Sequence, residues 1–113
     1  GQTIAAASLI DGTYFAINRN AGQTDTTATS AQIVAMVKGA TVGDFFKFTY
    51  FNASSNDVTL AGGTNVKMVN TAAASFSIAA GKGRIFALVL NNVGGGSEQV
   101  NMIPLTDVFN LNS

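Results

Sequence analysis

The side chains that most often do chemistry in proteins are scarce in this sequence. Its 113 residues include no histidine and no cysteine. A serine-histidine-aspartate triad and thiolate chemistry are therefore excluded, and zinc, copper and iron lose their usual ligands. The six acidic residues are dispersed without EF-hand spacing, although a calcium site assembled from separate loops stays open. The sequence predicts a protein that is not an enzyme and uses no cofactor or metal.

Two short motifs approach known signatures but differ from them at a required position. Asp25-Thr26-Thr27 begins like the Asp-Thr-Gly turn of aspartic proteases, with Thr27 in place of the glycine. Gly81-Lys82 is not a P-loop, because position 76 is Phe76 rather than glycine and Gly83 follows the lysine instead of serine or threonine. We interpret the first motif as part of a polar loop and the second as a turn.

The composition indicates a surface that is short of charge. Charged residues make up 11% of the chain, against about 25% in ordinary globular domains, and the net charge is zero. The six basic residues are scattered singly, so no basic stripe for nucleic acid is visible. The longest apolar run, Ile85 to Leu90, is too short for a membrane helix. So little charge predicts a surface partly covered by copies of the chain or by a partner.

The stretch from Gly43 to Phe51 concentrates aromatic residues with a period of two. Phe46, Phe48 and Tyr50 share one face, which we interpret as core. Phe45 and Phe51 share the other face with Lys47 and Thr49. Those two rings can belong to the core strand, to a sugar-stacking platform or to a contact with a neighbouring subunit. The absence of tryptophan and the charge-poor surface favour the subunit contact over the sugar platform.

The elements that must position these residues are mainly strands. Turn signals recur every eight to twelve residues, which predicts about eight strands in a single all-β domain over 1–113, an antiparallel β-sandwich or jelly-roll-like fold. One short helix is expected near 30–38, capped by Thr29 or Ser30. We expect a hairpin around Asp11-Gly12 within an N-terminal arm, 1–25, and a loop over 21–30.

Both ends of the chain carry apolar residues with almost no charge, whereas free chain ends are usually loose and polar. We therefore expect the first part of the arm, Gly1 to Ile10, and the C-terminal tail, 107–113, to reach other subunits, with simple edge strands as the alternative. The candidate interface residues, including the two outer aromatic residues above, are Ile4, Leu9, Ile10, Phe45, Phe51, Val108, Phe109 and Leu111.

The order of motifs between Ala28 and Leu105 resembles a family of small phage virion proteins encoded near the capsid genes. The matching residues are Ala31-Gln32, Val42-Gly43-Asp44 with Phe46 and Phe48, Asn52 with Ser54, Val58 to Gly62, Arg84, Leu90 to Val93, and Gly96-Ser97-Glu98 with Val100. The resemblance does not include the first 25 residues.

This resemblance implies a capsid decoration, or cement, protein on the outer surface of the virion. Members of the family are small β-rich oligomers, often homotrimers, so the implied partners are further copies of the chain and the major capsid protein. The alternative function is a receptor- or glycan-binding β module of a phage tail or head fibre.

Overall fold

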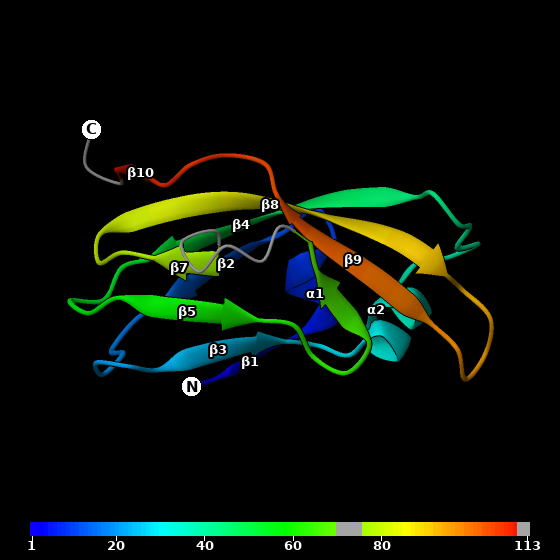
Figure 1. The fold of residues 1–113 in the computed structure, drawn as a ribbon, viewed down its shortest axis with the longest axis horizontal. Coiled ribbons are helices and arrows are strands. Elements are labelled where there is room, and N and C mark those ends of the chain that lie inside the picture. The colour runs from blue at the N-terminus through cyan, green and yellow to red at the C-terminus, as the bar shows by residue number, and fades with distance from the viewer. Residues whose placement is uncertain (70–75, 111–113) are drawn as a thin grey trace.

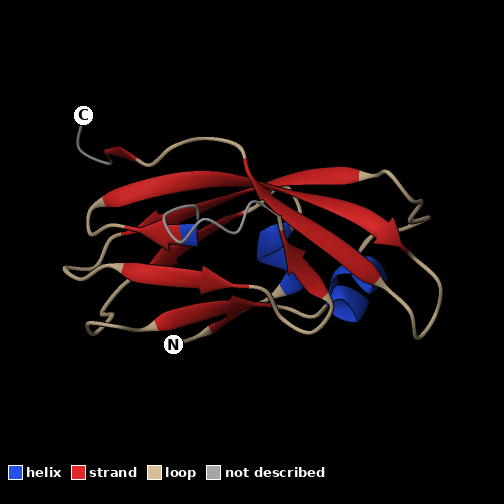
Figure 2. Cartoon of the chain, viewed as in Figure 1, coloured by secondary structure: helices blue, strands red, loops and turns tan. Residues whose placement is uncertain are grey.

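The computed structural model describes residues 1–69 and 76–110. Within them, strands form two layers, and two short helices contact each other, one near the middle of the molecule and the other toward the right in this view (Figures 1 and 2). The elements are β1 (Thr3–Ile4), α1 (Ala6–Leu9), β2 (Thr13–Ala16), β3 (Thr24–Thr27), α2 (Ser30–Met36), β4 (Phe45–Asn52), β5 (Val58–Ala61), β6 (Val66–Met68), β7 (Ser77–Ile78), β8 (Lys82–Asn92), β9 (Gln99–Pro104) and β10 (Phe109–Asn110). The prediction of a mainly β protein is confirmed.

The prediction of purely antiparallel sheets was wrong, because both sheets are mixed. The four-stranded sheet has the order β1-β3-β5-β7, and the six-stranded sheet has the order β2-β4-β8-β9-β6 with β10 beside β8. The pairs β1–β3, β3–β5, β2–β4 and β6–β9 are parallel. The first five strands belong alternately to the two sheets. The chain therefore crosses to the other sheet and back between β1 and β3, between β2 and β4, and between β3 and β5, and the two strands of each pair are parallel. Turn spacing along the sequence does not reveal this alternation.

The helix expected near 30–38 is confirmed as α2. Thr29 accepts a hydrogen bond from the Gln32 backbone N–H at 3.2 Å, and the Gln32 side chain accepts one from the Thr29 N–H at 2.9 Å. This reciprocal capping box satisfies two backbone donors that a helix start would leave free. Ile33 then points into the core and is fully buried.

Two predictions for the first thirty residues were wrong. The expected hairpin around Asp11 is absent, because α1 precedes the turn and β1 and β2 belong to different sheets. The loop expected over 21–30 contains β3, which lies between β1 and β5. Threonine is common in strands. The side chains of Asp25 and Thr27 face inward, where they accept hydrogen bonds from the Tyr50 hydroxyl and the Gly63 backbone N–H.

The core lies between the two sheets and is centred on the predicted aromatic strand. Phe48 and Tyr50 are fully buried, while Phe46 is half-buried and packs against the core. Phe48 stacks on Phe86 of β8 at 5.9 Å between ring centroids, and Phe86 stacks on Phe76 at 5.7 Å. The inward face of β4 is therefore the one that the period of two indicated.

Candidate functional site

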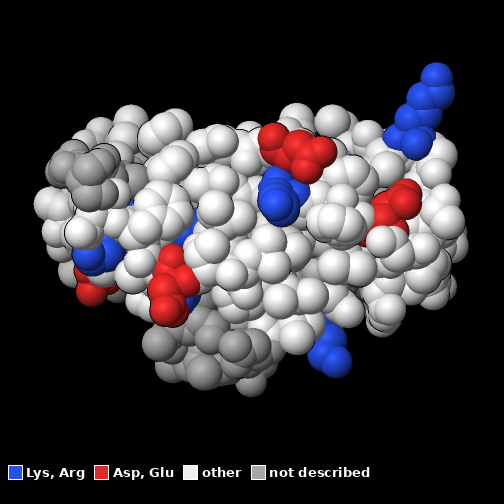
Figure 3. Space-filling view, turned by 90° about the horizontal axis from the view of Figure 1, so that it is seen from above, with Lys and Arg blue, Asp and Glu red and all other residues white. Residues whose placement is uncertain are grey.

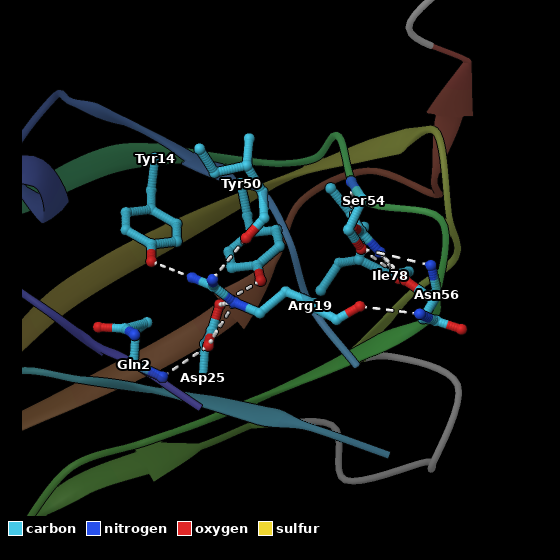
Figure 4. A network of polar contacts seen from close by, with 10 residues as sticks. Gln2, Tyr14, Arg19, Asp25, Tyr50, Ser54, Asn56 and Ile78 are labelled. Atoms are coloured by element: carbon cyan, nitrogen blue, oxygen red, sulfur yellow. Dashed lines mark hydrogen bonds and ion pairs between the residues drawn. The ribbon is translucent and has the colours of Figure 1, made fainter. Parts of the chain in front are cut away.

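A charged cluster lies buried between the two sheets at one end of the sandwich (Figure 4). Tyr14 on β2 and Tyr50 on β4 come from the six-stranded sheet, and Asp25 on β3 comes from the four-stranded sheet. Arg19 reaches the cluster from the connection between β2 and β3. The Asp25 side chain is fully buried and the Arg19 side chain is 8% exposed.

Each side chain of this cluster has hydrogen-bond partners. The Asp25 carboxylate accepts from Arg19 Nε at 3.1 Å, from the Tyr50 hydroxyl at 2.5 Å and from the backbone N–H of Gln2 at 2.9 Å. Arg19 also donates to the Ile17 carbonyl at 2.8 Å and to the Tyr14 hydroxyl. A buried ion pair with such complete hydrogen bonding holds both sheets, the β2–β3 connection and the start of β1 together.

The environment of the cluster keeps its two tyrosines protonated. Burial, together with the hydrogen bond to Asp25 and its negative charge, raises the pKa of the Tyr50 hydroxyl well above its ordinary value of 10.0. Burial and the Asp25 charge also raise the pKa of Tyr14, against the lowering effect of Arg19. Neither hydroxyl is therefore a base near neutral pH. We interpret the cluster as a structural clamp.

Alkaline pH is expected to weaken this clamp. Because the pKa of Tyr50 is raised on folding, its contribution to stability is intact below about pH 10 and is lost as pH rises beyond the unfolded value. Above pH 10, the free energy of unfolding of the native chain should fall by up to about 1.4 kcal/mol per pH unit more steeply than that of Tyr50→Phe. Urea titrations from pH 8 to pH 11.5 test this. Parallel curves for the two proteins would contradict it.

A second polar cluster closes the neighbouring corner of the sandwich. Asn52, at the end of β4, donates through Nδ2 to the carbonyls of Asn56 and Ile78 at 2.8 and 2.9 Å. Its Oδ1 accepts from the Ser54 hydroxyl and backbone N–H at 2.6 and 3.1 Å. Asn56 in turn donates to the Arg19 carbonyl at 2.8 Å, which joins the two clusters.

Neither cluster offers a vacant ligand position. Across residues 1–69 and 76–110, no buried side-chain nitrogen or oxygen lacks a hydrogen-bond partner, and no three acidic residues come together to hold a metal ion. No helix in the same residues is long and apolar enough to cross a membrane.

The outer face of the six-stranded sheet carries an aromatic row, which we define as Phe15, Phe51 and Phe109. The parallel pairing of β2 with β4 sets Phe15 beside Phe51, and their rings stack at 4.8 Å and 17°. Phe109 meets Phe51 edge-on at 5.9 Å and 82°. Phe15 is 60% exposed at the outer end of the row, and Ile17 close by in sequence is 58% exposed.

Gly83 allows this row to form. It pairs with Phe51 on β4 and with Phe109 on β10. A Cβ at position 83 would lie 2.8 Å from atoms of both rings, closer than side chains tolerate. The rings of Phe51 and Phe109 therefore occupy the space that a side chain at position 83 would need, and β10 is held by this contact as well as by its pairing.

Charge is sparse around the row. Seen from the side on which β8 and β10 lie, charged side chains form isolated spots and opposite-sign neighbours on a largely uncharged surface (Figure 3). Lys82 contacts Asn110, and Arg84 pairs with Asp107 at 3.4 Å. At the other end of β4, Phe45 and Val42 are 61% and 59% exposed. The described surface thus offers apolar contact at both ends of this sheet.

A third surface feature is a hollow beside the two helices, which we call the alanine hollow. Its volume is about 510 Å³. Thr3 and Gln32 contribute its polar groups, and its apolar walls are Ile4, Ala5, Ala6, Ala28, Ala35 and Met36. Met36 is 52% exposed at the end of α2. No charged residue lines this hollow.

Some of the interface residues predicted from the sequence are buried in the structure, and others are exposed or half-buried. Ile4 and Leu9 are fully buried in the chain's own core, so in this fold they are not available to another subunit. The arm was expected to reach outward, but β1 pairs with β3 and α1 turns Leu9 inward. Ile10 is half-buried against the core.

The outer aromatic residues and the tail are better placed for contact. Phe45 is exposed, while Phe51, Val108 and Phe109 are half-buried. Phe51 and Phe109 come together in the aromatic row, whereas Phe45 lies at the opposite end of β4. Leu111 lies outside the described residues.

Sequence reasoning missed Phe15 in the row and the pairing of Arg19 with Asp25. Phe15 alternates with the inward-facing Tyr14 and Ala16, which is a signal for an outward position. Its place beside Phe51 depends on pairing between strands 36 residues apart and has no local signal. Arg19 and Asp25 are single charges in polar stretches, and nothing in the sequence marks them as buried.

The comparisons with known proteins give no further guide. No protein-family description matches the chain, and neither the curated proteins nor the solved structures gave a significant match.

Proposed function

We propose that this chain is a non-enzymatic virion structural protein, a decoration or cement protein that self-associates and bridges major capsid proteins on the outer surface of a phage head. The observation that supports this most is the exposed apolar surface with little charge. Phe15, Phe45 and Val42 are each about 60% exposed. Large exposed apolar side chains at both ends of β4, with little charge around them, suit a surface that another protein covers.

The proposed mechanism is mechanical. Each added interface bridges neighbouring capsid subunits and opposes the outward pressure of packaged DNA. A contact of standard size buries about 1,600 Å² in total. Repeated over the shell, such contacts would stabilise the capsid at every site that the protein occupies. The buried clamp supports this role, because it holds the two sheets together without using the outer face. The jelly-roll-like sandwich stays part of the proposal, with the two layers of strands as its support.

The test combines the mass of the purified chain with its binding to capsids that lack it. We expect light scattering to give a homotrimer that co-sediments with these capsids and raises their melting temperature. Phe45→Lys should weaken co-sedimentation or assembly, whereas Thr59→Lys, at an exposed site on the other sheet, should not. A chain that leaves both the sedimentation and the melting of capsids unchanged would overturn the proposal.

The runner-up is a glycan- or receptor-binding module, and Phe15 is the observation that favours it. Its ring is 60% exposed and backed by the stacked Phe51 ring, an arrangement on which a sugar can lie. A glycan array and sugar-dependent shifts in the Tm of the free chain separate the two functions. Sugar binding that Phe15→Ala abolishes, without capsid binding, would support the runner-up.

A further inference from the structure

We propose that the free edge of β2 binds an extended segment of a partner protein, which adds a strand to the six-stranded sheet through main-chain hydrogen bonds. The β2 edge is defined as residues 13–17, which are the strand and the residue that follows it. The inference goes beyond the proposed function, because it concerns the conformation of the bound segment and not the identity of the protein that carries it.

The backbone of β2 is paired on one side only. β2 is the first strand in the order β2-β4-β8-β9-β6, and it runs parallel to β4. The carbonyl of Gly12 accepts a hydrogen bond from the Thr49 N–H at 3.1 Å, and the carbonyl of Ala16 accepts one from the Ala53 N–H at 2.9 Å. Successive peptide groups of a strand point in opposite directions, so the odd-numbered residues of the edge direct theirs away from β4.

Five main-chain groups of the β2 edge have no hydrogen-bond partner among the described residues. They are the N–H and C=O of Thr13, the N–H and C=O of Phe15, and the N–H of Ile17. The Ile17 carbonyl already accepts a hydrogen bond from Arg19 at 2.8 Å. The free groups recur at every second residue, which is the spacing at which a neighbouring strand presents its own donors and acceptors. A helix, a sugar or an apolar side chain does not present that pattern, so these groups select an extended backbone.

The β2 edge also lacks the features that keep free edges from pairing. Natural sheets protect an edge with charged side chains, prolines or bulges, or by keeping the strand very short. At the opposite edge of the same sheet, β6 has three residues with the exposed Lys67 at its centre. The edge strands of the other sheet, β1 and β7, have two residues each. Residues 13–17 contain no charge and no proline, and the pairing with β4 has no bulge. Among the edges in the described residues, this one is best suited to an added strand.

The exposed side chains of the edge indicate which sequence the segment would carry. Phe15 and Ile17 are 60% and 58% exposed, and Thr13 is exposed as well. In an added strand, the residue opposite Phe15 would place its Cβ about 5 Å from the Cβ of Phe15. We therefore expect aromatic or β-branched residues at alternate positions of the segment. A charged residue is not expected there, because the edge offers no opposite charge.

A second copy of the chain is a less suitable source of this strand. Two β2 edges paired with each other, each about 17 Å long, cover far less than the about 1,600 Å² of a standard interface between folded proteins. An extended segment is not held to that size, since main-chain hydrogen bonds supply its affinity. The edge is therefore assigned to a segment of a partner protein, and pairing between two copies is an outcome that the test must exclude.

The test uses four synthetic seven-residue peptides in which threonine alternates with valine, isoleucine, leucine or phenylalanine, with two lysines added at each end for solubility. At least one peptide should bind the native chain with a Kd below about 1 mM. N-methylation of one alternate set of backbone nitrogens should abolish binding, because those N–H groups face the β2 edge. Methylation of the other set should change the Kd by less than about threefold. Binding that survives both methylations, or no binding below about 1 mM by any of the four, would overturn the inference.

Two substitutions at Thr13 test the same hydrogen bonds from the side of the protein. Thr13→Pro removes an N–H that has no partner in the free chain, and it should raise the Kd at least about fivefold. Thr13→Val keeps the N–H and the shape of the side chain, so it should bind like the native chain. Circular dichroism and urea midpoints check that both variants are folded. If Thr13→Pro does not fold, the methylated peptides decide the question without any change to the protein.

Amide hydrogen exchange gives a signature that simple apolar contact would not produce. Saturating peptide should slow exchange at Thr13, Phe15 and Ile17 at least about tenfold. Exchange at Tyr14 and Ala16, whose peptide groups point toward β4, should stay as it is. Slow exchange at the first three positions in a free chain that light scattering shows to be a dimer would mean that a second copy occupies the edge, and it would overturn the inference.

Capsid co-sedimentation of the Thr13 variants keeps this inference distinct from the proposed function. A chain that binds the peptides at the β2 edge but ignores capsids would leave the strand addition standing and remove the decoration role. A chain that binds capsids but none of the peptides would do the reverse.

Discussion

Replacing Asp25 with alanine is expected to lower the free energy of unfolding by about 3–5 kcal/mol, a large part of the stability of a domain of this size. The change leaves the Arg19 guanidinium buried without its carboxylate, and it leaves the Tyr50 hydroxyl and the Gln2 N–H without an acceptor. The penalty is thus that of an unpaired buried charge combined with two donors that have lost their acceptor. Urea denaturation followed by circular dichroism measures it.

A control and a rescue make this prediction specific. Asp107 is also paired with an arginine, but its side chain is fully exposed and the pair is screened by water, so Asp107→Asn should leave the urea midpoint close to that of the native chain. If Asp25→Ala does not fold, the double variant Arg19→Met with Asp25→Leu removes both charges and should recover the part of the loss that comes from the unpaired charge. The Tyr50 hydroxyl and the Gln2 N–H still lack an acceptor in this variant. An Asp25→Ala protein within about 0.5 kcal/mol of the native chain would show that the clamp does not hold the sheets.

Replacing Asn52 with aspartate is expected to make stability strongly pH-dependent. The Asn52 amide nitrogen donates to the carbonyls of Asn56 and Ile78, and a carboxylate oxygen placed there would face both carbonyls without a proton to donate. The buried site therefore disfavours the charged form, so the pKa of the new carboxyl should rise on folding above its unfolded value of about 3.9.

The sign of the effect follows from that shift. Below about pH 4 the new carboxyl is protonated in both the folded and the unfolded state. The free energy of unfolding is then closest to that of the native chain. As pH rises, the loss should grow by about 1.4 kcal/mol per unit until the raised pKa is passed, and it should reach about 3 kcal/mol or more at pH 7. Urea midpoints of both proteins from pH 3.5 to pH 8 test this.

Asn92 provides the matched control for this substitution. It is exposed, and its side-chain oxygen accepts a hydrogen bond from the Gly94 N–H at 2.9 Å, which an aspartate can also do. Asn92→Asp should therefore change stability by less than about 0.5 kcal/mol at any pH in this range. If the free energy of unfolding of Asn52→Asp stays below that of the native chain by the same amount at every pH, the prediction is contradicted. The cluster around residue 52 would then relax or admit water.

These two clusters place the polar groups that hold the sheets inside the sandwich, so the outer face can carry exposed apolar side chains. The charged and amide groups that hold the sheets lie inside, at the end where the aromatic row lies outside. Substitutions on the outer face at Phe15 and Phe45 should therefore change association more than stability. This separation makes the surface variants proposed above informative.

The sequence by itself determined the features that depend on neighbours along the chain. The period of two in Phe45–Asn52 identified the inward face of β4, since alternation is a property of the strand alone. The capping box at Thr29 and Gln32 marked the start of α2, because both of its hydrogen bonds form within one helical turn. The dominance of strands followed from the same kind of local pattern.

Only the tertiary structure decided which strands pair and which apolar residues reach the surface. Alternation shows which residues share a face, but it does not specify the sheet, the neighbouring strand or its direction. The parallel pairing of β2 with β4 placed Phe15 beside Phe51, and the pairing of β1 with β3 buried Ile4. Contact across the two sheets likewise brought Asp25 to Arg19 and Tyr50, because the stability of such a cluster depends on partners that adjacent sequence does not contain.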